Sequence, residues 1–162
     1  MIISCGDKHK GESVAEVLIK DASYVKYVLS VTETEGLMTS IRDEMIRLIN
    51  IFNSKPFLQN CWGDNHKCGE VATGATAYKE DYIGLYWWCN DCDPYQSGAS
   101  MGTLHAITSY EDVLKYVYMV LNNNGKDSEA LIKRLAQEKG LPKRLSKGGI
   151  EKFFLPEGDS TV

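Results

Sequence analysis

Four cysteines in the middle of the chain have the residue type and the spacing of a metal site. Cys89 and Cys92 form a Cys-x-x-Cys pair, and Cys61 and Cys68 lie upstream with six residues between them. A zinc ion takes four thiolate or imidazole ligands in a tetrahedron, and two turns joined by a short sheet can supply them. The intervening residues have the β-prone, glycine-punctuated composition of such strands. The sequence therefore predicts a structural zinc ion bound by Cys61, Cys68, Cys89 and Cys92.

Residues from about 60 to 93 resemble a zinc ribbon, because an aromatic strand, GLYWW, leads directly into the second cysteine pair. Ribbons usually place two residues between the first two cysteines, whereas here there are six. His66 is therefore a rival ligand that would form a tighter pair with Cys68 and leave Cys61 out. The all-cysteine set is favoured.

Other uses of these cysteines remain open. A redox Cys-x-x-Cys pair would need a thioredoxin-like strand-to-helix context, which is not seen here. Buried thiols that only pack are a second alternative. A catalytic zinc ion is disfavoured because four protein ligands leave no position for water.

Trp87 and Trp88 follow each other on a predicted strand, so one is expected to face inward and the other outward. We assign the outward position to Trp88. Its ring would stack on a base or a partner side chain, or else cover the ribbon's own loop.

The turn Gly6–Gly11, with sequence GDKHKG, places two lysines and a histidine between glycines. Lys8 and Lys10, with His9, could contact phosphate ahead of a helix. General acid–base chemistry by His9 is disfavoured because only Asp7 stands nearby to orient the ring. A tight turn with solvated side chains is the alternative.

Residues from about 2 to 31 resemble the small C-terminal domain of exodeoxyribonuclease X and related phage and bacterial proteins. The resemblance rests on the glycine-flanked turn, on Glu16-Val17 in the following helix, and on the aromatic segment Tyr24–Leu29. It implies an accessory module that contacts DNA, without the nuclease's catalytic acids.

The formal charge of −4 argues against a protein that coats nucleic acid with its whole surface. Residues 133–152, however, carry seven lysines and arginines against two glutamates. This basic segment either keeps a helix soluble or contacts nucleic acid through Lys143, Arg144 and Lys147.

These residues must be positioned by an α+β fold. We expect an N-terminal strand-turn-helix module with a long helix, a central zinc-ribbon-like antiparallel sheet and a C-terminal helical pair. The corresponding domains would be residues 1–56, 57–108 and 109–162. The predicted strands are 2–5, 70–79, 82–89, 103–107 and 150–155. The predicted helices begin at Ser13, near Tyr24, at residue 35 after a Thr32–Glu35 capping box, at Ser109 with Asp112, and at Ser128.

The composition fits a folded protein, with 43% hydrophobic residues in 162. No apolar run is long enough to span a membrane, and the first residues do not resemble a secretory signal. A cytoplasmic location follows as the expectation, where cysteines serve as thiols or metal ligands rather than disulfides.

Three functions are open at this point. The favoured one is a non-catalytic, zinc-containing nucleic-acid-binding accessory protein, encoded by a phage or mobile element. The alternative is a protein-interaction adaptor or an inhibitor of a host nucleic-acid-processing or defence complex. An enzyme is disfavoured, since the acids at 81, 91, 93, 111 and 112 have no spacing that assembles a two-metal site.

Overall fold

The structure is a computed structural model that describes residues 1–4, 6–32, 35–92 and 104–155. It combines helices with a three-stranded antiparallel sheet, which confirms the α+β class. In chain order the elements are α1 Val14–Lys20, α2 Ala22–Ser30, α3 Leu37–Ser54, α4 Gly63–His66, β1 Gly74–Lys79, β2 Ile83–Trp88, a 3₁₀ turn Asn90–Cys92, β3 His105–Ile107, α5 Tyr110–Met119, α6 Gly125–Gln137 and α7 Lys147–Phe153. Asp93, the predicted loop 93–103 and the C-terminal tail lie outside the described residues.

The N-terminal helices begin at capped positions. Ser13 and Glu16 form a capping box at the start of α1, and the Asp21 side chain accepts a hydrogen bond at the start of α2. By contrast, α3 follows Gly36, which has φ of 60° and makes no side-chain cap. The predicted Thr32–Glu35 capping box is therefore wrong.

The predicted strand at residues 2–5 is also wrong for the part that is described. Ile2 forms a single antiparallel bridge with Ser13, and no strand extends from it within residues 1–4. Ile3 is nevertheless fully buried, and its backbone bonds to Glu12 and Gly11 close the turn. Ser13, the partner of Ile2, is already the N-cap of α1, so the pairing does not continue along the chain.

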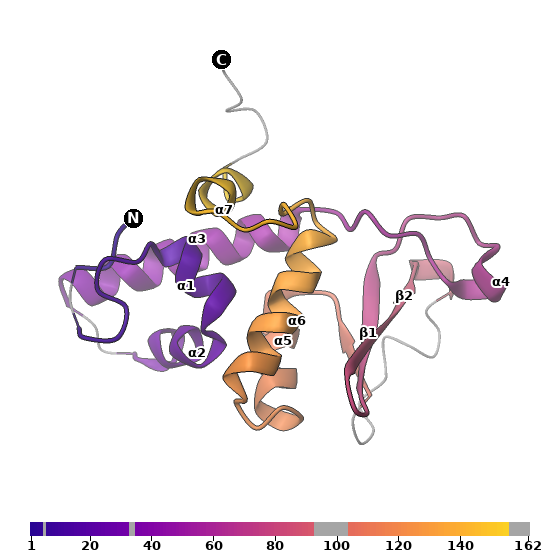
Figure 1. Cartoon of the computed structure of the whole chain (residues 1–162), viewed down its shortest axis with the longest axis horizontal. Helices are drawn as coiled ribbons and strands as arrows, with labels where there is room; N and C mark the ends of the chain where they lie inside the picture. Colours follow the sequence, from indigo (N-terminus) through magenta and orange to yellow (C-terminus); the bar gives the residue numbers. More distant parts are fainter. Residues whose placement is uncertain (5, 33–34, 93–103, 156–162) are drawn as a thin grey trace, which may run out of the picture.

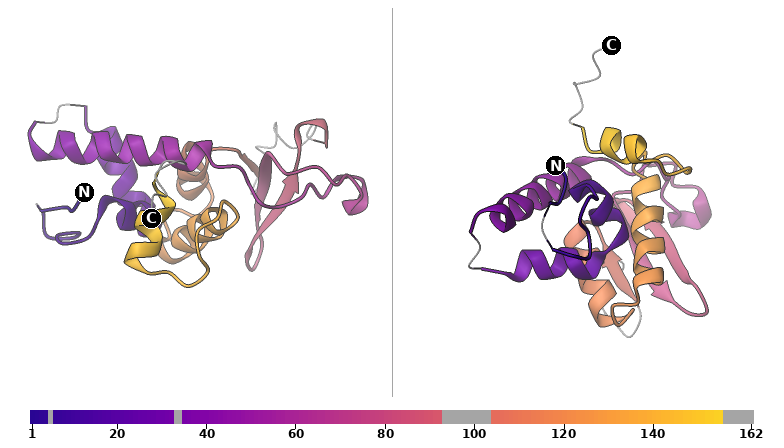
Figure 2. Two further views of the ribbon diagram at one scale, coloured as in Figure 1. Left: turned by 90° about the horizontal axis from the view of Figure 1, so that it is seen from above. Right: turned by 60° about the vertical axis from the view of Figure 1, so that its left-hand side comes forward.

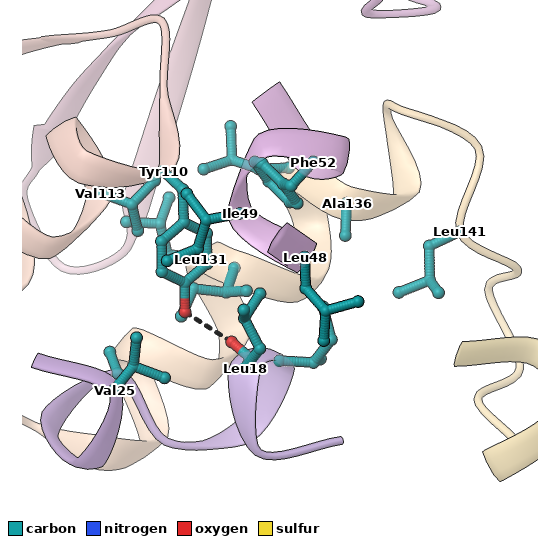
Figure 3. Close-up of a cluster of buried hydrophobic side chains, with 14 of the residues drawn as sticks. Leu18, Val25, Leu48, Ile49, Phe52, Tyr110, Val113, Leu131, Ala136 and Leu141 are labelled. Atoms are coloured by element: carbon teal, nitrogen blue, oxygen red, sulfur yellow. Dashed lines mark hydrogen bonds between the residues drawn. The ribbon is translucent and has the colours of Figure 1, made fainter. Parts of the chain in front are cut away.

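Helices from both ends of the chain share one hydrophobic core. In Figure 1, α5 and α6 lie between α1–α3 and the sheet, and Figure 2 shows α7 beside the N-terminal helices. The buried phenol of Tyr110 donates to the carbonyl oxygen of Leu18 at 2.6 Å, as drawn in Figure 3. The core draws buried residues from all three predicted domains, for example Val17, Ile49, Leu85, Val113 and Leu131. The division into domains stays a prediction.

The sheet has the order β2-β1-β3, with β1 antiparallel to both neighbours. Gly74 pairs with Trp88, and a Cβ on Gly74 would lie 2.3 Å from the indole ring. Gly84 is covered in the same way by Tyr78. Each glycine therefore lets an aromatic ring lie flat across the neighbouring strand.

The C-terminal helical pair is confirmed as α5 and α6. The predicted capping box of Ser109 and Asp112 is present, while α6 begins earlier than predicted because Asn124 caps it. The predicted strand at residues 150–155 is wrong: this stretch belongs largely to α7, capped by Ser146. Ile150, Phe153 and Phe154 are buried at helical spacing.

Among the described residues, no helix is both long and apolar enough to cross a membrane.

Candidate functional site

The four cysteines converge on one point. Their sulfur atoms all lie within 4.8 Å of one another, with Cys68 Sγ at 3.7 Å from Cys89 Sγ and 3.6 Å from Cys92 Sγ. These separations are too long for disulfides. A tetrahedron of sulfurs, each about 2.3 Å from a central zinc ion, has edges of about 3.8 Å. The donor set and its spacing therefore fit a tetrahedral metal ion.

Backbone hydrogen bonds hold the cysteine loops against the sheet. Cys61 N–H donates to the Glu70 carbonyl at 2.7 Å, and Trp62 N–H donates to the Trp87 carbonyl at 2.8 Å. Cys89 follows β2 directly, and the 3₁₀ turn then brings Cys92 back beside it. Gly63 comes so close that a Cβ there would lie 2.5 Å from Cys92 Sγ. The site thus depends on two loops that the sheet fixes in place.

The four thiols affect one another's ionisation. Backbone N–H groups of Cys92 and Asp91 lower the pKa of Cys89, although desolvation opposes them. Hydrogen bonds with the sulfurs of Cys68, Cys61 and Cys89 raise the pKa of Cys92 to about 12. A second thiolate in this cluster is unfavourable without a positive ion, and a bound divalent metal would reverse that.

His66 does not belong to the group of converging ligand atoms. It ends α4 in the left-handed region, with φ of 67°, and its exposed ring lies 5.1 Å from the ring of Trp62. The geometry favours the all-cysteine set among the ligands considered.

Trp88 is buried, so the expectation that it faces outward to stack on a base is wrong. Its side chain is 2% exposed, packs with Cys61 and Cys89, and donates from Nε1 to Thr76 Oγ1 at 3.0 Å. Trp87 is buried on the opposite face in the main core. Trp88 thus has the alternative role, that of covering the ribbon's own loops.

Two other aromatic rings reach the surface beside the cysteines. Trp62 is half-buried and Tyr86 is exposed; their rings lie 5.8 Å apart, and the Tyr86 hydroxyl donates to the Trp62 carbonyl. Strand alternation places Tyr86 on the same face of β2 as Trp88. This alternation is the feature of the sequence that could have identified Tyr86. The corresponding feature for Trp62 is its position directly after Cys61, one of the predicted ligands.

The N-terminal turn folds around His9. This side chain is 8% exposed, with Nδ1 at 2.6 Å from a Glu12 carboxylate oxygen and Nε2 at 3.0 Å from an Asp21 carboxylate oxygen. Lys8 Nζ lies 2.6 Å from the same Asp21 oxygen, while Lys10 is exposed. The orienting partners are therefore Glu12 and Asp21 rather than Asp7. An anion contact at this turn stays a prediction.

Part of the basic segment presents its charge at the surface, in the loop that follows α6 and at the start of α7. Lys143, Arg144 and Lys147 are exposed, and none has a carboxylate within 4.0 Å in the described part of the chain. Figure 1 shows α7 above the N-terminal helices, whereas α4 and the cysteine loops lie at the far end of the long axis. The cysteine centre therefore lies far from α7, which carries Lys147, and from the N-terminal helices with their turn.

Comparison of the chain with protein-family models, with curated proteins and with solved structures found no match.

Proposed function

We propose that this chain is a non-catalytic, zinc-containing accessory protein that binds nucleic acid. The observation that carries the proposal is the four-cysteine centre. Four cysteine sulfurs complete a tetrahedral coordination shell, so a bound zinc ion would have no open position for a substrate or a water nucleophile. The ion would act structurally, by tying the two loops to the sheet.

The basic segment supports the nucleic-acid part of the proposal. Lys143, Arg144 and Lys147 present three positive charges that no carboxylate neutralises within 4.0 Å among the described residues. Phosphate contacts by such residues give sequence-independent affinity even when the whole protein is acidic. The exposed ring of Tyr86 and the half-buried ring of Trp62 offer surfaces on which bases could stack. The resemblance of residues 2–31 to a DNA-associated accessory domain points the same way.

Metal analysis tests the zinc ion directly. Protein purified without chelators should contain about one zinc ion per chain, because four thiolates bind this ion tightly at neutral pH. A Cys92→Ser variant should lose most of it. A zinc content well below one per chain in the unmodified protein would contradict the proposal.

Salt-dependent binding tests the nucleic-acid part. In fluorescence anisotropy with labelled DNA and RNA, affinity should fall steeply as salt rises. A variant with Gln at 143, 144 and 147 should flatten the plot of log affinity against log salt by about 0.7 to 0.9 for each phosphate that the protein no longer neutralises.

Lys126→Gln is the matched control, because Lys126 is also exposed and unpaired within the described residues but lies at the start of α6. It should leave the slope unchanged. If the unmodified chain binds no nucleic acid at low salt, this part of the proposal fails, and capture of a protein partner after nuclease treatment would favour the adaptor alternative.

A further inference from the structure

A second feature of the basic segment is a pocket of about 350 Å³ where the ends of α3 and α6 meet α7. Lys55, Lys139 and Lys152 line it together with Phe153, and none of its lining residues in the described part of the chain is acidic. The elements that form it come from distant parts of the sequence, and Figure 1 shows the ends of α3 and α6 next to each other beneath the loop that leads to α7. Its size lies at the lower end of the range for small-molecule sites.

Lys139 is the central residue of this pocket. It is 7% exposed, and its ammonium group donates to the carbonyl oxygen of Lys55. The ammonium nitrogen also lies 4.0 Å from the ring centroid of Phe57. No carboxylate lies within 4.0 Å of it among the described residues. A buried cation without a counter-charge is costly, so the pocket has a deficit of negative charge.

Lys55 and Lys152 add two further positive charges to the pocket. Lys55 is half-buried, with its ammonium nitrogen 5.2 Å from the ring centroid of Phe153, and Lys152 is exposed at the rim. Lys139 by itself can be explained by a structural role. Its ammonium group stabilises the C-terminal end of α3, where Lys55 is the C-cap residue. That role gives no reason for two further lysines to line the same pocket.

We propose that this pocket binds a phosphate group, with the ammonium groups of Lys55, Lys139 and Lys152 as its donors. Lysine serves as a point charge for phosphate, and the three ammonium groups keep up to eight N–H donors besides the one that Lys139 gives to the Lys55 carbonyl oxygen. Burial lowers the pKa of Lys139 to about 8, so the group is still mostly charged at neutral pH. The phosphate belongs either to a small free ligand or to a nucleic-acid backbone. The site does not depend on the zinc ion.

The test uses inorganic phosphate and the full-length, metal-loaded protein. Titration to about 20 mM phosphate should shift the backbone amide NMR signals of Gly140 and Gly149, which line the pocket, with a millimolar or tighter dissociation constant. The same ionic strength supplied as sodium chloride should not. Lys55→Gln and Lys152→Gln should each weaken phosphate binding about tenfold, because each removes one charged hydrogen bond.

Lys126→Gln is the matched control, since it removes an exposed charge, unpaired within the described residues, at the start of α6 without lining the pocket, and it should leave phosphate affinity within about twofold. A single-stranded oligonucleotide that displaces phosphate from the pocket would identify the backbone as the source; failure to displace it would identify a small phosphate ligand.

No phosphate-specific shift, or equal weakening by Lys126→Gln, would overturn the inference. Nucleic-acid binding that persists unchanged in the Lys55 and Lys152 variants would leave the proposed function standing while removing the backbone as the pocket's ligand.

Discussion

His9 and Asp21 form the most connected polar group of the N-terminal turn. Both ring nitrogens of His9 face carboxylate oxygens, Nδ1 that of Glu12 and Nε2 that of Asp21. Asp21 in turn accepts from Lys8, from His9 and from the backbone N–H of Tyr24 at the start of α2. One carboxylate therefore ties the lysine–histidine turn to the helix that follows it.

The same carboxylate, that of Asp21, should make the free energy of unfolding depend on pH. Burial alone would raise the pKa of Asp21, but the hydrogen bonds from Lys8, Tyr24 N–H and His9 outweigh it and lower the pKa. Because the folded-state pKa lies below the unfolded value of about 3.9, the contribution is fully present above that value. It is lost as the pH falls through the folded-state pKa.

Asp21→Asn should therefore lower the free energy of unfolding by about 1 to 2 kcal/mol at pH 7 while keeping the cap of α2. Urea unfolding from pH 7 down to pH 2 measures it. The difference between the variant and the unmodified protein should shrink below about pH 4. A difference that stays constant over this range would contradict the assignment.

The loops around the sheet depend on glycines that leave room for larger groups. Gly63 is the clearest case, because a Cβ added there would lie 2.5 Å from the sulfur of Cys92 and 3.3 Å from the sulfur of Cys61. Any side chain at this position has to displace Cys92, one of the four clustered cysteines.

Gly63→Ala should weaken metal binding by at least tenfold and destabilise the protein by about 1 to 3 kcal/mol. Competition with a chromogenic chelator measures the affinity, and thermal unfolding measures the stability. Gly148→Ala is the control, since an added Cβ there meets nothing within 4 Å and alanine favours the helix α7. Equal metal affinity in both variants would refute the role of Gly63.

Local patterns predicted some elements well and others badly, for physical reasons. The cysteine spacing and the apolar stripe of α3 are properties of short stretches, so the sequence was sufficient to predict the cluster and the helix. The apolar run Ile150–Leu155 is too short for its pattern to distinguish a strand from a helix. Gly148 and Gly149 have low helix propensity, yet both lie in α7, because tertiary packing outweighs that propensity. The partners of His9 and the burial of Lys139 depend on how distant segments fold together, which no local pattern reports.

At the scale of the whole molecule, the buried side chains of the described residues form two groups that are stabilised in different ways. The main core joins α1–α3 to α5–α7 and to the Trp87 face of the sheet, and it consists of ordinary hydrophobic packing. The second cluster contains Cys61, Trp88 and Cys89 and has few members. A group this small cannot support its loops by burial alone, so the proposed metal ion carries most of that task.

Removing the metal should therefore loosen one end of the molecule and leave the other folded. After chelation, amide hydrogen exchange should accelerate at Cys61, Trp62 and Thr73, whose N–H groups join the cysteine loops to the sheet. Amides within α1, α3 and α6 should stay protected, and helical circular dichroism should change little. Loss of protection throughout the chain would show instead that the metal supports the main core.

The hydrogen bond from Tyr110 to Leu18 joins residues 92 positions apart, and α1 packs against α6 and α7. During synthesis, the N-terminal helices therefore leave the ribosome long before the surfaces that cover them have been made. Their apolar faces stay exposed until α5 to α7 have been synthesised, which favours chaperone binding or aggregation in the meantime. The N-terminal helices therefore cannot complete their core early, because helices that are made later supply its other half.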